Sequence, residues 1–503
     1  MNFFSKLKII LLFIIAFLPR VFDLGGNSLF ADEITWMSRS KAVYAAVRSG
    51  VWEYFKTGWW LDKTMAEPIG IPVTFLGGVA MTYLTPGYSS HSLNITRDFI
   101  ATRIPEAIIG ILFVPVFYLL LKKFTNDKIA FITALLIALD PVSISLSRWL
   151  HQDMALMAFS TLSLLIFFYS DRKVATIFSA IFASMTILTK PQGFIVPLTV
   201  FAVCVIGIVK KEKINLKRLG LWVLVIISCT VLFFPFLWHE PIKGMIQYLS
   251  TQIGNANNGQ LTFFNGQITT SPPWYYYFAI FPFRVPESVF MGLLVGLILG
   301  IQNLRKSFFG NKFIQVAIIY SVIFLFTISL SNKKIGIRYL FGIWPYIYIT
   351  AVYGLTLIEK HVKKVYKWAF WLVVFLFPVW GILKFYPSYY LYYNHFISPQ
   401  KFQSLESIAF CDGVKPSVEY LEPKLYHGIT IMLSGCDSGI NYYTGFTINR
   451  VNNVSDKPEY VIEETHDAQK FPNTVKQIRE SGYKEIKQID FRGIILAKIY
   501  QKP

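Results

Sequence analysis

Long apolar runs, separated by short polar segments, dominate the first 395 residues of the chain. A helix rises about 1.5 Å per residue, so about 20 apolar residues cross the roughly 30 Å of membrane hydrocarbon. The first run follows Lys6 and Lys8 but ends without the small residues of a cleavage site, so we expect it to be retained. The pattern predicts about eleven membrane-spanning helices, near residues 7–23, 103–121, 129–147, 153–169, 174–189, 192–209, 219–237, 286–302, 313–330, 339–358 and 368–385.

Basic residues gather in the short segments between alternate runs, and they predict the orientation of the chain. The segment 210–218 carries five Lys or Arg residues and one acidic residue, Glu212. The positive-inside rule therefore predicts a cytoplasmic N-terminus and, after an odd number of spans, an extracytoplasmic C-terminus. The inner segments on this reading are 122–128, 171–173, 210–218, 304–312 and 360–367.

The outer segments differ from the inner ones in length and composition. The first, 24–102, is long and interleaves tryptophans with polar residues, so we expect helices lying on the membrane surface. Within it, 71–84 is apolar but short and flanked by prolines, which favours a re-entrant or surface helix over a further span. A second long outer segment, 238–277, is polar in its middle.

The tail beyond about residue 398 has a different composition. It contains β-like runs at 428–433, 460–462 and 493–499 and helical patterns at 417–421 and 474–481. We predict a small extracytoplasmic α/β domain over 398–503, following a membrane domain over 1–397. Cys411 and Cys436 lie in this tail, where they either form a disulfide or remain free thiols.

Composition supports an α-helical polytopic membrane protein. Hydrophobic residues make up 54% of the chain and charged residues only 15%, against roughly 25% charged in soluble domains. The net charge of +19 is explained by the basic inner segments, so it gives no reason to expect nucleic acid as a partner. The chain has no P-loop, no Rossmann glycine pattern, no Gly-x-Ser-x-Gly elbow and no His-Glu-x-x-His helix, which leaves soluble nucleotide chemistry unsupported.

Two adjacent carboxylates, Asp32 and Glu33, stand just outside the first predicted span. Charge close to hydrocarbon is costly and often marks a functional site. A carboxylate here could remove a proton from an acceptor hydroxyl. The alternative is that Asp32 caps a helix starting near Ile34 and Glu33 favours its first turn.

His151 and Asp153 follow the third predicted span and face the same side as Asp32. The pair either contributes to the site or Asp153 caps the fourth span. Asp32, His151 and Asp153 could meet around a divalent cation, although no cofactor is firmly implied and we assign no metal ligands. His239 and Glu240, where the seventh span emerges, are candidates for contact with a substrate.

Lys333, Lys334 and Arg338 form a basic cluster on the outer side, where the positive-inside rule disfavours positive charge. Arg offers two parallel donors and Lys a compact charge, so a lipid phosphate is a natural ligand, with ordinary anionic lipid as the alternative. Arg103 and Lys190 lie near the same boundary and either hold a phosphate or extend their charges to water.

Several stretches resemble one family of membrane enzymes, the GT-C glycosyltransferases, whose members include protein O-mannosyltransferases and the lipid A aminoarabinose transferase. The loose matches keep their order over residues 7–395, and the tail is similar to the extracytoplasmic domain of some bacterial members. The large lumenal insert of the protein mannosyltransferases is missing. The matching stretches are Ser28-Leu-Phe-Ala-Asp-Glu33, Arg103-Ile-Pro-Glu-Ala, Arg148-Trp-Leu-His-Gln-Asp153, Thr189-Lys-Pro-Gln-Gly193, Arg338-Tyr-Leu-Phe-Gly-Ile-Trp-Pro345 and Tyr386-Pro-Ser-Tyr-Tyr-Leu-Tyr-Tyr-Asn394.

The resemblance implies a transferase that moves a hexose or pentose from a polyprenyl-phosphate donor to a lipid, glycan or protein acceptor. It implies a catalytic role for Asp32 and places Asp153 at a second acidic motif near the active cavity. We expect Glu33 to support Asp32, and Tyr339 and His151 to contact substrate. Lys333, Lys334 and Arg338 lie where relatives bind the donor phosphate. The alternative is a transporter or flippase for a lipid-linked glycan, although the chain shows no pair of related halves.

Overall fold

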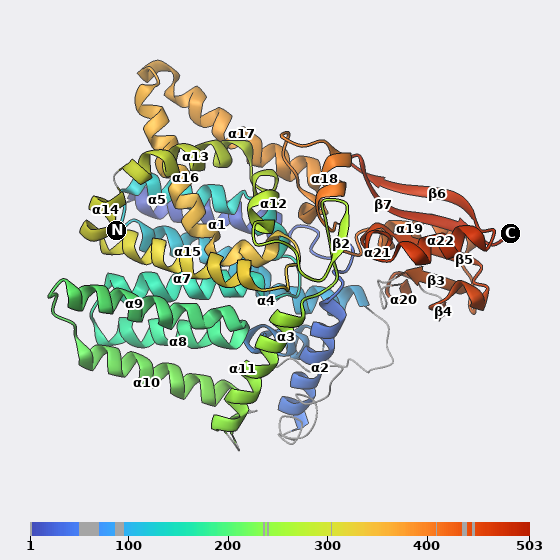
Figure 1. The fold of residues 1–503 in the computed structure, drawn as a ribbon, viewed down its shortest axis with the longest axis horizontal. Coiled ribbons are helices and arrows are strands. Elements are labelled where there is room, and N and C mark those ends of the chain that lie inside the picture. The colour runs from blue at the N-terminus through green and yellow to red at the C-terminus, as the bar shows by residue number, and fades with distance from the viewer. Residues whose placement is uncertain are drawn as a thin grey trace.

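The structure is a computed structural model that describes residues 3–49, 70–85, 95–234, 237–238, 241–302, 304–408, 410–434, 440–444 and 448–503. Long helices form a bundle, and a small sheet lies at one end of it (Figure 1). The N-terminus lies at the opposite end of the bundle from the sheet (Figure 1). The predicted fold class, a polytopic helical protein with a small C-terminal mixed sheet, is confirmed.

Each predicted span corresponds to a helix or a broken helix. Six helical stretches of the described chain are long and apolar enough to cross a membrane, and shorter apolar helices join them. The helices at the predicted spans are α1 (Phe3–Val21), α4 (Ile95–Leu121), α5 (Asp127–Ala138), α6 (Pro141–Leu146), α7 (Asp153–Tyr169), α8 (Lys173–Thr189), α9 (Ile195–Val209), α10 (Leu216–Phe233), α13 (Glu287–Gln302), α15 (Lys312–Leu330), α16 (Trp344–His361) and α17 (Lys367–Phe385).

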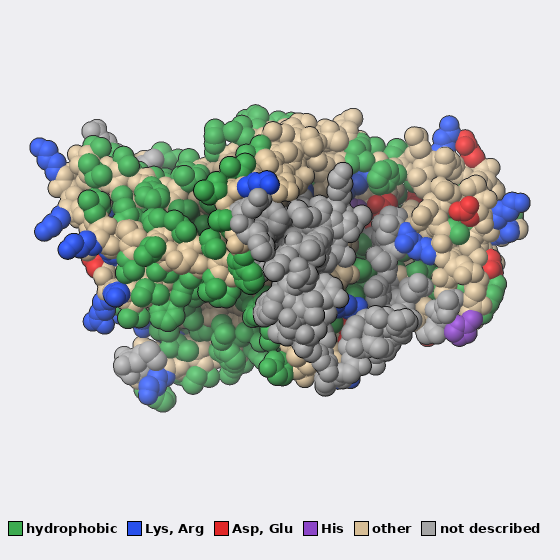
Figure 2. All heavy atoms as spheres, turned by 90° about the horizontal axis from the view of Figure 1, so that it is seen from below, with side chains coloured by type: hydrophobic (Ala, Val, Ile, Leu, Met, Phe, Trp, Pro, Cys, Tyr) green, Lys and Arg blue, Asp and Glu red, His purple; other side chains and the backbone are tan. Residues whose placement is uncertain are grey.

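The surface of the bundle is that of a multi-pass membrane protein. Large apolar side chains such as Val209, Leu232 and Phe326 are exposed on its helices. In Figure 2 apolar side chains cover the bundle, while Lys and Arg gather at its left end and on the tail. Exposed apolar surface on this scale is stable only against lipid or another protein.

The predicted span 129–147 is two helices, not one. Pro141 has no N–H to donate and disfavours helix at the preceding residue, so α5 ends before Asp140 and α6 begins at Pro141. Asp140 caps α6 by accepting a hydrogen bond from Ser143 N at 2.6 Å. Arg20 of α1 is fully buried and donates to the free carbonyl of Ala138 at 2.9 Å, which satisfies the end of α5.

The segments predicted to lie on the outer side carry short helices and a hairpin. Helix α3 packs against α2 and α4, and Val73 of α3 shares a buried cluster with Met37 and Leu150. The short helices and the hairpin lie around the end of the bundle that faces the tail (Figure 1). They are α2 (Glu33–Ser49), α3 (Ile71–Leu84), α11 (Pro241–Asn258), α12 (Tyr276–Arg284), β1 (Thr262–Phe264), β2 (Gln267–Thr269) and the 3-10 helices Pro191–Phe194, Ile337–Ile343 and Tyr389–Leu391; α14 (Leu304–Gly310) and the 3-10 helix Lys364–Tyr366 lie between spans.

The tail contains a five-stranded sheet in the order β4-β3-β5-β7-β6. Strand β3 pairs in parallel with β4 and β5, whereas β7 pairs antiparallel with β5 and β6. The three predicted strands correspond to β3 (Thr430–Ser434), β5 (Tyr460–Glu464) and β7 (Ile494–Gln501), but the pattern did not predict β4 (Asn449–Val451) or β6 (Lys484–Phe491). The tail helices are α18 (Pro399–Leu405), α19 (Val414–Leu421), α20 (Ile440–Tyr443), α21 (Thr465–Lys470) and α22 (Pro472–Glu480).

The bundle and the tail share a hydrophobic cluster. Phe385 and Tyr393, which precede the predicted boundary at 397, pack with Phe402 and Ile494 of the tail. We propose that the boundary between the membrane domain and the tail domain lies at 397–398, because α18 begins at Pro399. The two domains are packed together across this boundary. Cys411 is disulfide-bonded; Cys436, for which the sequence left a disulfide and a free thiol open, lies outside the described residues.

Candidate active site

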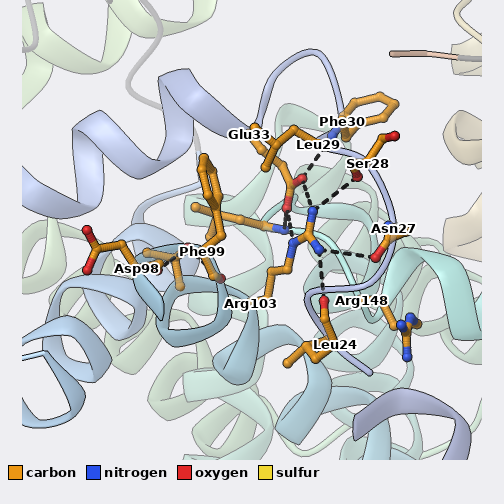
Figure 3. Close-up of polar contacts among 12 residues, drawn as sticks. Leu24, Asn27, Ser28, Leu29, Phe30, Glu33, Asp98, Phe99, Arg103 and Arg148 are labelled. Atoms are coloured by element: carbon orange, nitrogen blue, oxygen red, sulfur yellow. Dashed lines mark hydrogen bonds and ion pairs between the residues drawn. The ribbon is translucent and has the colours of Figure 1, made fainter. Parts of the chain in front are cut away.

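The loop between α1 and α2 is held by a buried ion pair, Glu33 with Arg103, which we call the Glu33 clamp (Figure 3). Arg103 Nε and Nη2 donate to the two Glu33 carboxylate oxygens at 2.8 and 2.6 Å. The remaining donors of Arg103 bind Leu24 O, Asn27 Oδ1 and Ser28 O. Glu33 also accepts from Phe30 N and Leu150 N, each at 2.8 Å.

The Glu33 clamp has no donor left for a ligand. Arg103 carries five N–H groups, and every one of them already has an acceptor in the loop or on Glu33. Both side chains are buried. We therefore reassign Arg103, predicted to bind a donor phosphate, to positioning the loop, and we give Glu33 the same supporting role.

Asp32 lies beside the clamp but in a different environment. Its side chain is 49% exposed, and its Oδ2 lies 3.3 Å from Arg338 Nη1 and 3.6 Å from His151 Nε2. Burial alone would raise the pKa of Asp32, but the neighbouring His151 ring and the Arg338 charge outweigh it and hold the pKa below its usual range. Asp32 is therefore an ionised carboxylate with half of its surface accessible.

A chain of charged groups extends from Asp32. Arg338 Nη1 lies 2.7 Å from His151 Nε2. A guanidinium can only donate, so Nε2 accepts and the ring proton is on Nδ1, which lies 2.7 Å from Asp153 Oδ2. Asp153 in turn accepts from Lys190 Nζ. We call Asp32, His151, Asp153, Lys190 and Arg338 the Asp32 cluster.

The predicted basic cluster divides into two roles. Arg338 is 5% exposed, and within the described residues its Nε has no partner, so a donor remains for a ligand. Lys334 is buried and donates to the backbone carbonyls of Pro272 and Ser331, which holds the outer segments together. Lys333 is half-buried. Burial lowers the pKa of Lys190, and the charges of Arg338 and Lys333 lower it further. The Asp153 carboxylate acts in the opposite direction and raises it.

Aromatic rings surround the Asp32 cluster. The Arg338 guanidinium lies 4.8 Å from the Phe30 ring centroid and 5.6 Å from that of Tyr339, and Lys190 Nζ lies 4.9 Å from the Tyr339 ring. Tyr339, predicted to contact substrate, thus lies between two cations. A ring face stabilises such cations without neutralising them, which leaves their charge available to an anion.

The tail also reaches the Asp32 cluster, which the sequence did not predict. Phe410 is 5.3 Å from Phe30 between ring centroids and 5.9 Å from the Arg338 guanidinium. Phe410 also contacts His466 of α21, with 4.3 Å between the two ring centroids. Nothing in the local sequence marks these residues, because their relation to Asp32 depends on the docking of the tail.

The predicted substrate contacts of two residues and the predicted option of a divalent cation remain untested. His239 and Glu240 lie outside the described residues. Within the described part of the chain, no group of three or more His, Cys, Asp and Glu side chains is arranged to hold a metal ion. The Arg338 guanidinium occupies the space between Asp32 and His151 where a shared cation would have to lie.

Solved structures share this architecture. ArnT from Cupriavidus metallidurans, solved bound to undecaprenyl phosphate, is 13% identical, with a TM-score of 0.53 over 99% of this chain and 97% of its own. The oligosaccharyltransferase AglB from Archaeoglobus fulgidus, solved with an inhibitory peptide and a dolichol-phosphate, is 11% identical, with a TM-score of 0.55 over 100% of this chain and 74% of its own. The chain therefore has the GT-C fold of membrane glycosyltransferases.

The sequence comparison agrees with the fold. The family model for dolichyl-phosphate-mannose-protein mannosyltransferases matches residues 51–242. No curated protein sequence matches the chain. The resemblance to GT-C glycosyltransferases seen in the sequence is confirmed by the shared fold and by this family match over part of the chain.

Proposed function

We propose that the protein transfers a sugar from a polyprenyl-phosphate donor to an acceptor hydroxyl, with inversion, at the outer face of the membrane. The observation that carries the proposal is the contact of Asp32 with Arg338, at 3.3 Å. It sets a half-exposed carboxylate next to a guanidinium that has a spare donor. The ligands named for ArnT and AglB, undecaprenyl phosphate and dolichol-phosphate, support a lipid-linked donor.

In this mechanism the acceptor oxygen attacks the anomeric carbon while Asp32 takes its proton. The bond between that carbon and the phosphate oxygen breaks, and the electron pair leaves with the polyprenyl phosphate. The leaving group needs positive donors and no general acid, and Arg338, Lys190 and Lys333 supply them. His151 and Asp153 hold Arg338 and Lys190 in place.

The ion pair between Asp32 and Arg338 makes Asp32 a weak base before substrate binds, because its pKa is low. A donor phosphate competes for the same guanidinium. Once Arg338 turns to the phosphate, Asp32 loses its closest positive partner and becomes more basic. The donor thus activates the base, which is the order that a transferase requires.

The test uses the purified protein in proteoliposomes that contain a radiolabelled polyprenyl-phosphate sugar. Label that appears on an added acceptor supports transfer. Label that only crosses the bilayer supports the flippase alternative and overturns the proposal. A panel of lipid, glycan and peptide acceptors then identifies the acceptor class, and a parallel reaction with a chelator tests for a divalent cation.

A further inference from the structure

Helix α21 of the tail carries two buried side chains that nothing in the mechanism uses, Lys470 and His466. Both are less than one-tenth exposed. Lys470 Nζ donates to His466 Nε2 at 2.8 Å, which places the imidazole proton on Nδ1. Among the described residues His466 Nδ1 has no hydrogen-bond partner, and the carboxylates of Asp467 and Glu464 act on the charge of Lys470.

This arrangement leaves donors without acceptors in a buried place. An ammonium has three N–H groups, and only one of them is used here. A buried N–H without an acceptor is costly. The unused N–H groups on this helix can bind an anion, and phosphate oxygens are acceptors only.

The pair also lies next to the Asp32 cluster. The His466 ring packs at a tilt of 44° against Phe410, whose ring is in turn 5.9 Å from the Arg338 guanidinium. Helix α21 contacts β1, and Thr262 of β1 donates to the Lys334 carbonyl at 2.9 Å. Burial lowers the pKa of Lys470 to about 8; the charges of Asp467, Glu464 and Asp32 oppose this shift, and that of Arg338 adds to it.

We propose that Lys470, oriented by His466, is a donor-binding residue that the tail contributes to the phosphate site around Arg338. This inference rests on the proposed function and extends it, because it makes the tail part of the donor site. It also gives the unused N–H groups of the Lys470 ammonium an acceptor, beside the carboxylates of Asp467 and Glu464 that act on its charge.

The test measures binding of undecaprenyl phosphate to the full-length protein in nanodiscs. We expect Lys470→Met to weaken binding about tenfold or more, and Lys470→Arg to retain most of it. Lys476→Met is the matched control, because Lys476 lies in the neighbouring helix α22 with its side chain 72% exposed. Melting temperatures measured without ligand identify any variant that fails to fold, and Lys470→Gln then replaces Lys470→Met.

The outcomes separate this inference from the function it rests on. If Arg338→Met weakens binding but Lys470→Met and Lys470→Gln do not, the role of Lys470 is wrong and the proposed function stands. If the unmodified protein does not bind undecaprenyl phosphate at all, both are wrong. Weaker binding in His466→Phe, which keeps the ring on Phe410 but loses both nitrogens, would support the orienting role of His466.

Discussion

Asp32 and Glu33 are neighbours in sequence but belong to two different kinds of charge network. Glu33 is fully buried and accepts from Arg103 and from two backbone N–H groups at 2.6–2.8 Å. Asp32 is half-exposed, and its contacts with Arg338 and His151 are 3.3 and 3.6 Å long. The comparison teaches that every charge of the Glu33 network has its partners, whereas the Asp32 cluster keeps a donor to spare on Arg338, which is the property that our proposed mechanism uses.

The largest effect should come from Asp32. We expect Asp32→Asn to lower kcat roughly 10²–10⁴-fold, because the amide cannot take the acceptor proton. Expression and melting temperature should stay normal, since the side chain is half-exposed. Transfer assays under saturating donor measure the effect, with the exposed Asp456→Asn as the control. Normal turnover in Asp32→Asn would contradict the catalytic role that we propose for the Asp32 cluster.

Glu33 should give the opposite result. Glu33→Gln leaves Arg103 as a buried charge without its counter-ion, and breaking such a pair costs about 3–5 kcal/mol of folding free energy. Thermal unfolding in detergent, followed by size-exclusion chromatography, measures the loss. A Glu33→Gln protein that melts normally but fails to catalyse transfer would contradict the structural role of the Glu33 clamp.

A smaller effect is expected where the tail supports the same loop. Tyr443 accepts a hydrogen bond from Leu29 N at 2.6 Å. Tyr443→Phe leaves this backbone N–H without its partner, at a cost of about 1–3 kcal/mol. We expect earlier cleavage in the tail under limited proteolysis, with little change in kcat. Tyr426→Phe, which removes an exposed contact with Glu459, is the control and should behave like the unmodified protein.

The smallest effect is a pH dependence of donor binding, which we expect from Lys470 beside the Asp32 cluster and not from the Glu33 clamp. Lys470 has a pKa of about 8, so it is charged below pH 8 and loses its charge as the pH rises through that value. Donor affinity should therefore fall a few-fold between pH 7 and pH 9, and Lys470→Arg should abolish this fall. An identical decline in Lys470→Arg would place the titrating group elsewhere. The charged groups that act on Lys470 are Asp467, Arg338, Glu464, Asp32 and its neighbour His466.

Much of the fold could be predicted because membrane helices are encoded locally. A run of apolar residues is sufficient evidence for a span, and all the predicted spans are helical. The break at Asp140 depends on Arg20, a residue far away in sequence that satisfies the free carbonyls. Strand β6 was missed because it is an edge strand, and half of its positions are exposed and charged.

The candidate site could be predicted only in part. Sequence reasoning placed Asp32, His151, Asp153, Lys190 and Arg338 on one side, and the structure brings them together; their chemical roles remain proposals. It could not distinguish Arg103 from Arg338, because both are arginines near the same boundary and only packing shows which has a donor to spare. Lys470 was missed since its local sequence is that of an ordinary polar helix.

The docking of the tail on the first loop has a consequence for how the protein is made. Ser28 Oγ donates to Asp412 O at 3.0 Å across a sequence separation of 384 residues, and Lys415 donates to Gly26 O at 2.7 Å. At about 5–20 residues per second, a ribosome takes roughly 20–80 s to synthesise that interval. The loop that carries Asp32 therefore enters the membrane long before its last supports exist. A chain that stalls or is truncated before Asp412 lacks these contacts, so the site that we propose can be complete only after this part of the tail has been made.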